Sequence, residues 1–291
     1  MLLTSVIDKW IGRAATPSPA ALEAVRGLSP AVVVTGGSAG IGLALANRFA
    51  IAGRRVALVA RDETRLAAAA EEVTRAGGRD AAAIVLDVTA ADAPVKLDVA
   101  LSAHGLYLDV LVNCAGIGLA GEFDAAAVRD IERLVALNVT ALTRLMRHAF
   151  PQMKARGSGG ILNVASLAGY APGPYQAAYY ASKAYVLSLT EALAEEAAGN
   201  GVRICVVAPG PVETRFHSRM GTEGALYRTF IRALTPNAVA ASAYRGFMLG
   251  RRVVVPGLLP TALMLAARVT PHPLLVPIMG LLLRPPAKGT T

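Results

Sequence analysis

The sequence predicts an α/β domain built on a doubly wound parallel sheet. Seven short apolar runs rich in Val, Ile and Leu recur along the chain, and segments of helix-forming composition separate them. Nearly continuous apolar runs are typical of strands buried on both faces, and their alternation with helices is typical of a parallel sheet covered on both sides. The predicted strands are AVVVT (31–35), RVALVA (55–60), AIVL (83–86), DVLVN (109–113), GILNVA (160–165), RICVVA (203–208) and RVVV (252–255).

Length and composition favour one folded domain with an extension at each end. The chain has 291 residues, of which 54% are hydrophobic and 17% charged, so it can form a large core. We expect an extension over 1–30, a core domain over 31–256 and an apolar extension over 257–291.

The first predicted strand leads into a glycine-rich turn, TGGSAGIG (35–42), which opens the next helix. Gly36, Gly40 and Gly42 allow a sharp turn and a close approach of the backbone to a phosphate group. The helix that follows presents free N–H groups and the positive end of its dipole. The spacing predicts a turn that binds the pyrophosphate of a dinucleotide, although a glycine turn alone also fits a tight strand–helix connection.

The second predicted strand ends at Ala60, and Arg61 follows it. At this place a dinucleotide fold meets the adenosine ribose: a carboxylate is typical of NAD sites, whereas an arginine accommodates the 2′-phosphate of NADP. The sequence therefore favours NADP(H) over NAD(H). Asp62 is expected to cap the next helix, and the alternative is that Arg61 only pairs with Asp62.

A further motif combines a serine, a tyrosine and a lysine. Tyr179 and Lys183 are four residues apart on a predicted helix, so their side chains emerge on one face. Ser166 follows the strand GILNVA, at the edge of the sheet where the glycine turn also lies. A phenol with an ordinary pKa of about 10 is a poor base at neutral pH, but a neighbouring ammonium stabilises the phenolate. The three side chains thus predict acid–base chemistry at a substrate oxygen.

Taken together, these motifs resemble the short-chain dehydrogenase/reductase family, and the resemblance runs through most of residues 31–256. LDV (86–88) is similar to the family's adenine-contacting segment, and APGPVET (208–214) to its proline–glycine motif near the nicotinamide. VNCAG (112–116) resembles the N-N-A-G motif, with Cys114 where the family usually has its second asparagine. LNV (137–139) supplies the asparagine of the family's Asn-Ser-Tyr-Lys tetrad.

The resemblance implies a Rossmann-type sheet and assigns roles to the tetrad. Tyr179 would be the acid or base, Lys183 would favour its phenolate and hold the nicotinamide ribose, and Ser166 would orient the substrate oxygen. Asn138 would support a proton-relay water near Lys183. The implied cofactor contacts are Gly36, Ser38, Gly40, Ile41, Gly42, Arg61, Asp87, Val88, Asn113, Ala115, Gly116, Tyr179, Lys183, Pro209, Gly210, Val212 and Thr214. Residues 211–236 are expected to form a mobile substrate lid, because they lack a strand pattern.

Composition excludes several other functions. The net charge is +9, but the basic residues are dispersed and aromatic residues make up only 5%, so we expect no nucleic-acid binding. Cys114 and Cys205 both lie in predicted strands and indicate buried free thiols in a reducing compartment, here the cytoplasm. Four histidines without tight spacing predict no metal site.

The two ends of the chain depart from a minimal enzyme. Residues 1–15 have apolar side chains at helical spacing, and Pro17 and Pro19 are expected to end this amphipathic helix. Residues 257–291 are strongly apolar but are interrupted by Pro260, Pro271, Pro273 and Pro277, so no continuous spanning helix is expected. We expect this segment to pack beside the substrate entrance and across a subunit contact, with a peripheral membrane contact as the alternative.

The sequence thus predicts an NADP(H)-dependent oxidoreductase that transfers a hydride to or from a carbonyl or secondary alcohol, on an apolar substrate. A homo-oligomer, dimer or tetramer, is expected. The alternatives are a non-catalytic NADP-binding sensor, which would not require Ser166, Tyr179 and Lys183 together, and a serine hydrolase. The segment ASLAG around Ser166 lacks the G-x-S-x-G elbow of such hydrolases.

Overall fold

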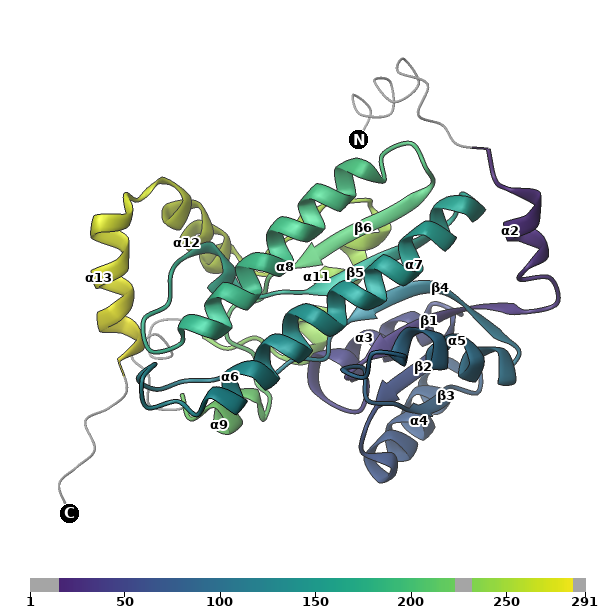
Figure 1. Ribbon diagram of the computed structural model, residues 1–291, viewed down its shortest axis with the longest axis horizontal. Helices are drawn as coiled ribbons and strands as arrows, with labels where there is room; N and C mark the ends of the chain where they lie inside the picture. Colours follow the sequence, from purple (N-terminus) through teal and green to yellow (C-terminus); the bar gives the residue numbers. More distant parts are fainter. Residues whose placement is uncertain (1–15, 223–231, 285–291) are drawn as a thin grey trace.

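The computed structural model describes residues 16–222 and 232–284, and there a seven-stranded parallel sheet lies between two layers of helices (Figure 1). The strand order is β3-β2-β1-β4-β5-β6-β7, and every neighbouring pair is parallel. The predicted doubly wound, Rossmann-type α/β fold is confirmed. The strands are β1 (Ser29–Thr35), β2 (Arg55–Ala60), β3 (Ala82–Val85), β4 (Leu106–Asn113), β5 (Gly159–Val164), β6 (Val202–Val207) and β7 (Val253–Val254).

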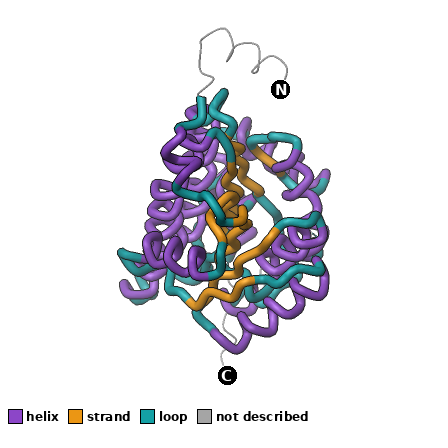
Figure 2. Tube along the Cα trace, turned by 90° about the vertical axis from the view of Figure 1, so that its right-hand side faces the viewer, coloured by secondary structure: helices purple, strands orange, loops and turns teal. Residues whose placement is uncertain are grey.

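Helices cover both faces of this sheet, as the edge-on view in Figure 2 shows. Three helices pack on one face: α5 (Ala93–Ala103), α7 (Leu142–Arg156) and α8 (Ala177–Glu196). The opposite face is covered by α3 (Gly40–Ile51), α4 (Glu63–Gly77) and α11 (Pro236–Met248). The shorter elements are α2 (Pro19–Glu23), α6 (Val128–Val135), the π-helical turn η1 (Ala136–Ala141), the 3₁₀ turn η2 (Leu167–Tyr170) and α9 (Phe216–Met220).

The double cover explains why the strands are apolar without alternation. Ala31, Val32, Val33 and Val34 of β1 are all fully buried, because successive side chains point into the two different helix layers. The predicted strand positions are therefore correct; the largest difference is at β4, which begins three residues earlier than predicted, and β7 is one residue shorter at each end.

The chain reverses its winding direction between β1 and β4. From β1 it builds outward to β3 at one edge, and it then crosses back so that β4 pairs with the other side of β1. The helices that follow β1 and β4 therefore diverge, and a crevice opens at the carboxyl ends of these two strands. This is the place where open α/β sheets bind ligands.

The C-terminal extension forms two helices, α12 (Leu258–Val269) and α13 (His272–Leu283), beyond the carboxyl ends of the strands (Figure 1). Pro271 separates them, as expected. Pro277 instead lies inside α13, so the expectation that each proline divides the segment is wrong there. Among the described residues, no helix is long and apolar enough to cross a membrane.

Three other predictions concern the N-terminal segment, the lid and the two cysteines. The amphipathic helix predicted over 1–15 lies outside the described residues, and Pro19 begins the short helix α2, which the sequence did not predict. The predicted lid contains α9, while its residues 223–231 also lie outside the described part. Cys205 is buried in β6, but Cys114 follows β4 and is only partly buried, because β4 ends at Asn113.

Candidate active site

A cavity of about 1580 Å³ opens at the carboxyl ends of the strands. The glycine turn after β1 and the loops after β4, β5 and β6 form its inner part, and α8 provides one side. Side chains of α12 and α13 form the outer wall. The glycine turn and the segments of Ser166, of Tyr179 with Lys183 and of Pro209 therefore meet at one crevice, although they are spread over most of the chain.

The glycine turn is built so tightly that three of its glycines, Gly36, Gly37 and Gly42, have no room for a side chain. Gly36 has a positive φ of 67°, and a Cβ there would lie 3.0 Å from the backbone of Ala115. A Cβ at Gly42 would overlap the carbonyl oxygen of Gly36. The helix α3 begins directly after this turn, and its N-cap Ala39 gives it no side-chain cap. The first-turn N–H groups thus face the cavity, which suits a phosphate group.

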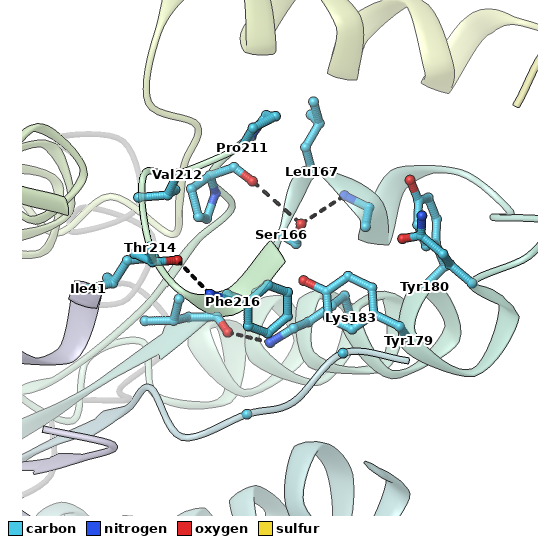
Figure 3. A pocket seen from close by; sticks show the side chains of 18 of the residues that line it. Ile41, Ser166, Leu167, Tyr179, Tyr180, Lys183, Pro211, Val212, Thr214 and Phe216 are labelled. Carbon is cyan, nitrogen blue, oxygen red and sulfur yellow. Dashed lines mark hydrogen bonds between the residues drawn. The ribbon is translucent and has the colours of Figure 1, made fainter. Parts of the chain in front are cut away.

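Tyr179 and Lys183 lie one turn apart on α8 and both line the cavity (Figure 3). The Lys183 Nζ atom lies 5.8 Å from the centroid of the Tyr179 ring and donates a hydrogen bond of 3.0 Å to the carbonyl oxygen of Val164. Burial lowers the pKa of Lys183 to about 8, because desolvation disfavours the ammonium, and the charge interaction with Cys114 acts in the opposite direction. At neutral pH the lysine remains a cation beside the phenol ring.

Ser166 faces the same space from the end of β5. Its Oγ accepts a hydrogen bond of 3.2 Å from the backbone N–H of Ala168, where the turn η2 begins, and this contact fixes the side chain. As a donor, the hydroxyl has only a long contact of 3.5 Å to the carbonyl oxygen of Pro209. A ligand oxygen at ordinary hydrogen-bond distance would compete well for this proton.

An aromatic group surrounds the tyrosine. The ring of Phe216 on α9 lies 5.6 Å from the Tyr179 ring, and the ring of Tyr180 lies 6.1 Å away (Figure 3). All three side chains line the cavity. The catalytic candidate is thus held in a largely apolar setting, where electrostatic contacts are stronger than in water.

Asn138 is placed differently from the other members of the predicted tetrad. It lies in the π-helical turn η1, is almost completely buried and does not line the cavity. Its side-chain oxygen accepts from the N–H of Ile117 at 2.9 Å, and its side-chain nitrogen donates to the carbonyl oxygen of Ile117 at 2.8 Å. The structure therefore gives this side chain a positioning contact with the loop after β4.

The segment after β2 holds two arginines. Asp62 caps α4 by accepting from the N–H of Arg65 at 3.0 Å, as predicted, and its carboxylate also pairs with the Arg65 Nε atom at 2.6 Å. Arg61 does not take that partner: its guanidinium lies 3.9 Å from the carboxylate of Asp87. The alternative pairing of Arg61 with Asp62 is therefore wrong.

The Asp87 carboxylate closes a turn with Thr89 and accepts hydrogen bonds from both the N–H and the hydroxyl of that residue. These bonds, followed by the charge of Arg61, hold the pKa of Asp87 below its ordinary value. Asp87 thus stays ionised beside Arg61 at neutral pH, at the side of the crevice after β3.

The predicted site residues divide into two groups. Those that line the cavity are Gly36, Ser38, Gly40, Ile41, Ala115, Gly116, Ser166, Tyr179, Lys183, Pro209, Gly210, Val212 and Thr214. Those that do not line it are Gly42, Arg61, Asp87, Val88, Asn113 and Asn138. Asn113 is buried between β4 and β5, where its side-chain nitrogen donates to the side-chain oxygen of Asn163 at 2.8 Å.

Sequence reasoning missed several lining residues. Arg65 lines the cavity beside the glycine turn. It could have been found from its position, because it lies three residues after the predicted helix cap Asp62. Gln176, one residue before α8, is buried at the cavity, and no local pattern indicated it. The C-terminal extension was expected at the substrate entrance, and its side chains do line the cavity.

A glycine turn at the switch point of a parallel sheet, together with a serine and a Tyr–Lys pair in the same crevice, defines the class of dinucleotide-dependent oxidoreductases. The family model for short chain dehydrogenases matches residues 30–223. The chain belongs to the short-chain dehydrogenase/reductase family, whose members bind a nicotinamide cofactor.

Individual relatives agree with this assignment. A short chain dehydrogenase of Pseudocercospora fijiensis is 39% identical over 62% of this chain, which spans only 59% of that relative. A galactitol 2-dehydrogenase of Cereibacter sphaeroides is 37% identical over 72% of the chain and 84% of its own length. A short-chain dehydrogenase from Sphingobium yanoikuyae in complex with NADPH is 33% identical over 79% of this chain and 88% of its own, with a TM-score of 0.72, and other solved relatives are complexes with NADH or NAD.

Proposed function

We propose that this protein uses NADP(H) to interconvert a carbonyl group and a secondary alcohol on an apolar compound. One observation carries the proposal: Ser166 and Tyr179 face one cavity from different elements, with the buried cation of Lys183 beside the phenol. Such an arrangement serves a reaction in which negative charge develops on a substrate oxygen.

The glycine turn and the N-terminus of α3 would hold the pyrophosphate of the cofactor. The fit is supported by the close backbone packing at Gly36 and Gly42 and by the uncapped first turn of α3. When bound, the nicotinamide supplies the hydride in reduction and accepts it in oxidation. Lys183 would also contact the nicotinamide ribose, and Asn138 would support a water near Lys183, as the family resemblance implies.

In the reductive direction, Ser166 donates a hydrogen bond to the carbonyl oxygen and orients it. Tyr179 transfers its phenolic proton to the same oxygen as the carbonyl carbon gains the hydride, which yields the neutral alcohol. The phenolate that remains is stabilised by the Lys183 ammonium until a proton from solvent restores the phenol. Oxidation runs through the same contacts in reverse, with the phenolate of Tyr179 as the base.

The preference for NADP(H) rests on the residues after β2. Ala60 ends that strand without a carboxylate, and two arginines, Arg61 and Arg65, follow within five residues. The side chain of Arg61 is more than half exposed and is held by one long ion-pair contact of 3.9 Å, so it remains available to a phosphate.

The substrate class follows from the outer wall of the cavity. This wall consists of apolar side chains from the C-terminal helices, with Leu259 and Leu263 on α12 and Leu275 and Met279 on α13. The volume of about 1580 Å³ exceeds the usual range of roughly 300–1,000 Å³ for one small ligand, so there is room for the cofactor and a bulky substrate. Acyl chains, steroids and xenobiotic ketones all have suitable chemistry.

We also propose that the protein acts in the cytoplasm as a homo-oligomer, a dimer or tetramer. The support for a reducing compartment is that Cys114 and Cys205 are both free thiols. The support for the oligomer is the set of exposed apolar side chains, which includes Val128 of α6 and Tyr185 of α8.

The test is a fluorescence titration with NADPH and NADH, followed by a panel of apolar and polar carbonyl compounds, with turnover followed by the absorbance of reduced nicotinamide. We expect tighter binding of NADPH and measurable reduction of bulky apolar ketones. Tight NADPH binding without turnover of any compound would favour the alternative of a non-catalytic sensor.

A further inference from the structure

The helix α12 is apolar on two separate sides. One side, with Leu259 and Leu263, lines the cavity. The other side carries Leu258, Leu265 and Val269, which do not line this cavity and are 92%, 55% and 81% exposed. Their spacing of seven and four residues places them on one helix face. An amphipathic helix that only covered the cavity would have a polar outer side.

The helix α13 repeats this arrangement. Leu275 and Leu283 are buried toward the cavity, whereas Leu274 and Leu281 are 61% and 64% exposed. We call the five exposed side chains the outer hairpin face: Leu258, Leu265, Val269, Leu274 and Leu281. Five large aliphatic side chains on two consecutive short helices are more than the scattered exposed residues of an ordinary surface.

The net positive charge of the chain belongs to its C-terminal part, which includes this face. Basic residues are spread along the whole sequence, but the last acidic residue is Glu223. Residues 224–291 therefore contain no Asp or Glu, and they contain eight Arg or Lys residues. The preceding 223 residues are almost neutral, with 21 basic and 20 acidic residues. Of the eight, Arg268 and Arg284 lie on or directly after the two helices, and both are exposed.

We infer that the outer hairpin face docks on the surface of an anionic lipid bilayer. Exposed aliphatic side chains would enter the headgroup and acyl boundary, and Arg284 beside them would contact lipid phosphates. Each helix has 12 residues, a length of about 18 Å, so the two helices lie in the interface and do not cross the hydrocarbon layer of about 30 Å.

A second copy of this chain fits the face less well. In a two-fold contact the same patch meets itself, so Arg268 and Arg284 of one copy would face a patch that carries the same positive charges. The segment 224–291 has no carboxylate to neutralise them. Glu191 on α8, which lies beside α12, already contacts Arg268 at 3.8 Å.

Docking would place the hairpin wall of the cavity against the bilayer, so that an apolar substrate dissolved in lipid could enter past α12 and α13. This consequence rests on the proposed function, whereas docking itself does not.

The test is co-sedimentation of the full-length protein with vesicles, in the absence of cofactor and substrate, so its outcome is independent of catalysis. We expect binding to phosphatidylcholine vesicles that contain phosphatidylglycerol, weaker binding to pure phosphatidylcholine, and weakening by salt. The triple variant L258S/L265S/V269S should lower the partition coefficient by at least about tenfold. The matched control V95S/V99S removes two equally exposed valines from α5, 59% and 65% exposed, and should bind like the wild type.

Two results would overturn the inference. The first is wild-type protein that stays in the supernatant with both vesicle types, or a triple variant that binds as strongly as the wild type. The second is a triple variant whose mass in light scattering falls by half, which would assign the face to a second copy. If circular dichroism shows that the triple variant does not fold, Arg284→Glu serves instead: it should weaken binding to the anionic vesicles several-fold, and unchanged binding would again refute docking.

Discussion

Asn138 binds both main-chain polar groups of Ile117, with its side-chain oxygen 2.9 Å from the Ile117 nitrogen and its side-chain nitrogen 2.8 Å from the Ile117 oxygen. This pair fixes the loop after β4, where a Cβ at Gly116 would lie 3.2 Å from the Asn138 side chain and 3.7 Å from the Lys183 Nζ atom. The asparagine thus sets the distance between that loop and the lysine of the candidate site.

Replacing Asn138 by alanine should therefore impair the site without touching the cavity directly. The two partly buried main-chain groups of Ile117 lose their partner, which lowers the free energy of unfolding by about 1 kcal/mol, and the loop is free to shift. We expect a lower melting temperature and a fall in kcat. A variant with normal stability and normal kcat would show that the contact is dispensable.

Tyr179→Phe should abolish turnover and leave NADPH binding nearly unchanged, because it removes only the transferable proton. Loss of the general acid should lower the rate by at least about 10²-fold. The matched control is Tyr185→Phe on the same helix, whose hydroxyl contacts Thr143 at 3.0 Å and lies outside the cavity lining. Substantial activity in the Tyr179 variant would transfer the role of proton donor to Tyr180 or to water.

Arg61→Ala should weaken NADPH binding much more than NADH binding, because only NADPH carries the 2′-phosphate. A lost charge-assisted contact is worth about 1.5–3 kcal/mol, or roughly ten- to a hundredfold in affinity. Titrating Arg65→Ala in parallel will show which arginine reads the phosphate, since Arg65 lines the cavity and Arg61 does not. Equal weakening of both cofactors by both variants would refute the NADP preference.

The stability of the wild type should rise relative to Lys183→Met as pH increases through the alkaline range. The folded pKa of Lys183 is about 8, below the ordinary 10.5, so between these values the unfolded state binds more protons than the native state. By linkage, increasing pH then stabilises the native wild type, by up to on the order of 3 kcal/mol across this window. Urea unfolding of both proteins at several pH values measures the difference between their unfolding free energies. A difference that does not change with pH would contradict the lowered pKa of Lys183.

The loss of the Lys183 proton at alkaline pH should also lower the rate of carbonyl reduction. Above a pH of about 8 the buried ammonium is lost, so the phenolate of Tyr179 is no longer stabilised. We expect kcat/KM for reduction to fall through this range.

The inner side of the C-terminal hairpin should control substrate affinity. Leu263→Ser introduces a hydroxyl into the apolar wall and should raise KM for apolar ketones by about tenfold, with little effect on NADPH affinity. The matched control is Leu265→Ser, on the outer side of the same helix. With a ketone that is soluble in water, this variant should have the KM of the wild type. Deletion of residues 257–291 should have the larger effect in the same direction; unchanged substrate kinetics would leave the hairpin without this role.

Much of the fold was readable from local patterns. The seven apolar runs predicted the seven strands because a strand buried between two helix layers needs apolar side chains in succession, as in Ala31–Val34. The glycine turn was also readable, since at Gly36 a positive φ and a close backbone contact require glycine. Ser166, Tyr179 and Lys183 followed from short spacings and from the rule that parallel strands share one carboxyl edge.

The tertiary structure decided the contacts that connect distant segments. No local signal predicts that Arg61 approaches Asp87 or that Asn138 is committed to Ile117, because these partners are set by how the loops pack. The apolar C-terminal sequence by itself indicated only that something must cover its side chains. Which leucines line the cavity and which face outward was settled when α12 and α13 packed across the crevice, because burial depends on the neighbours that a residue meets and not on its own hydrophobicity.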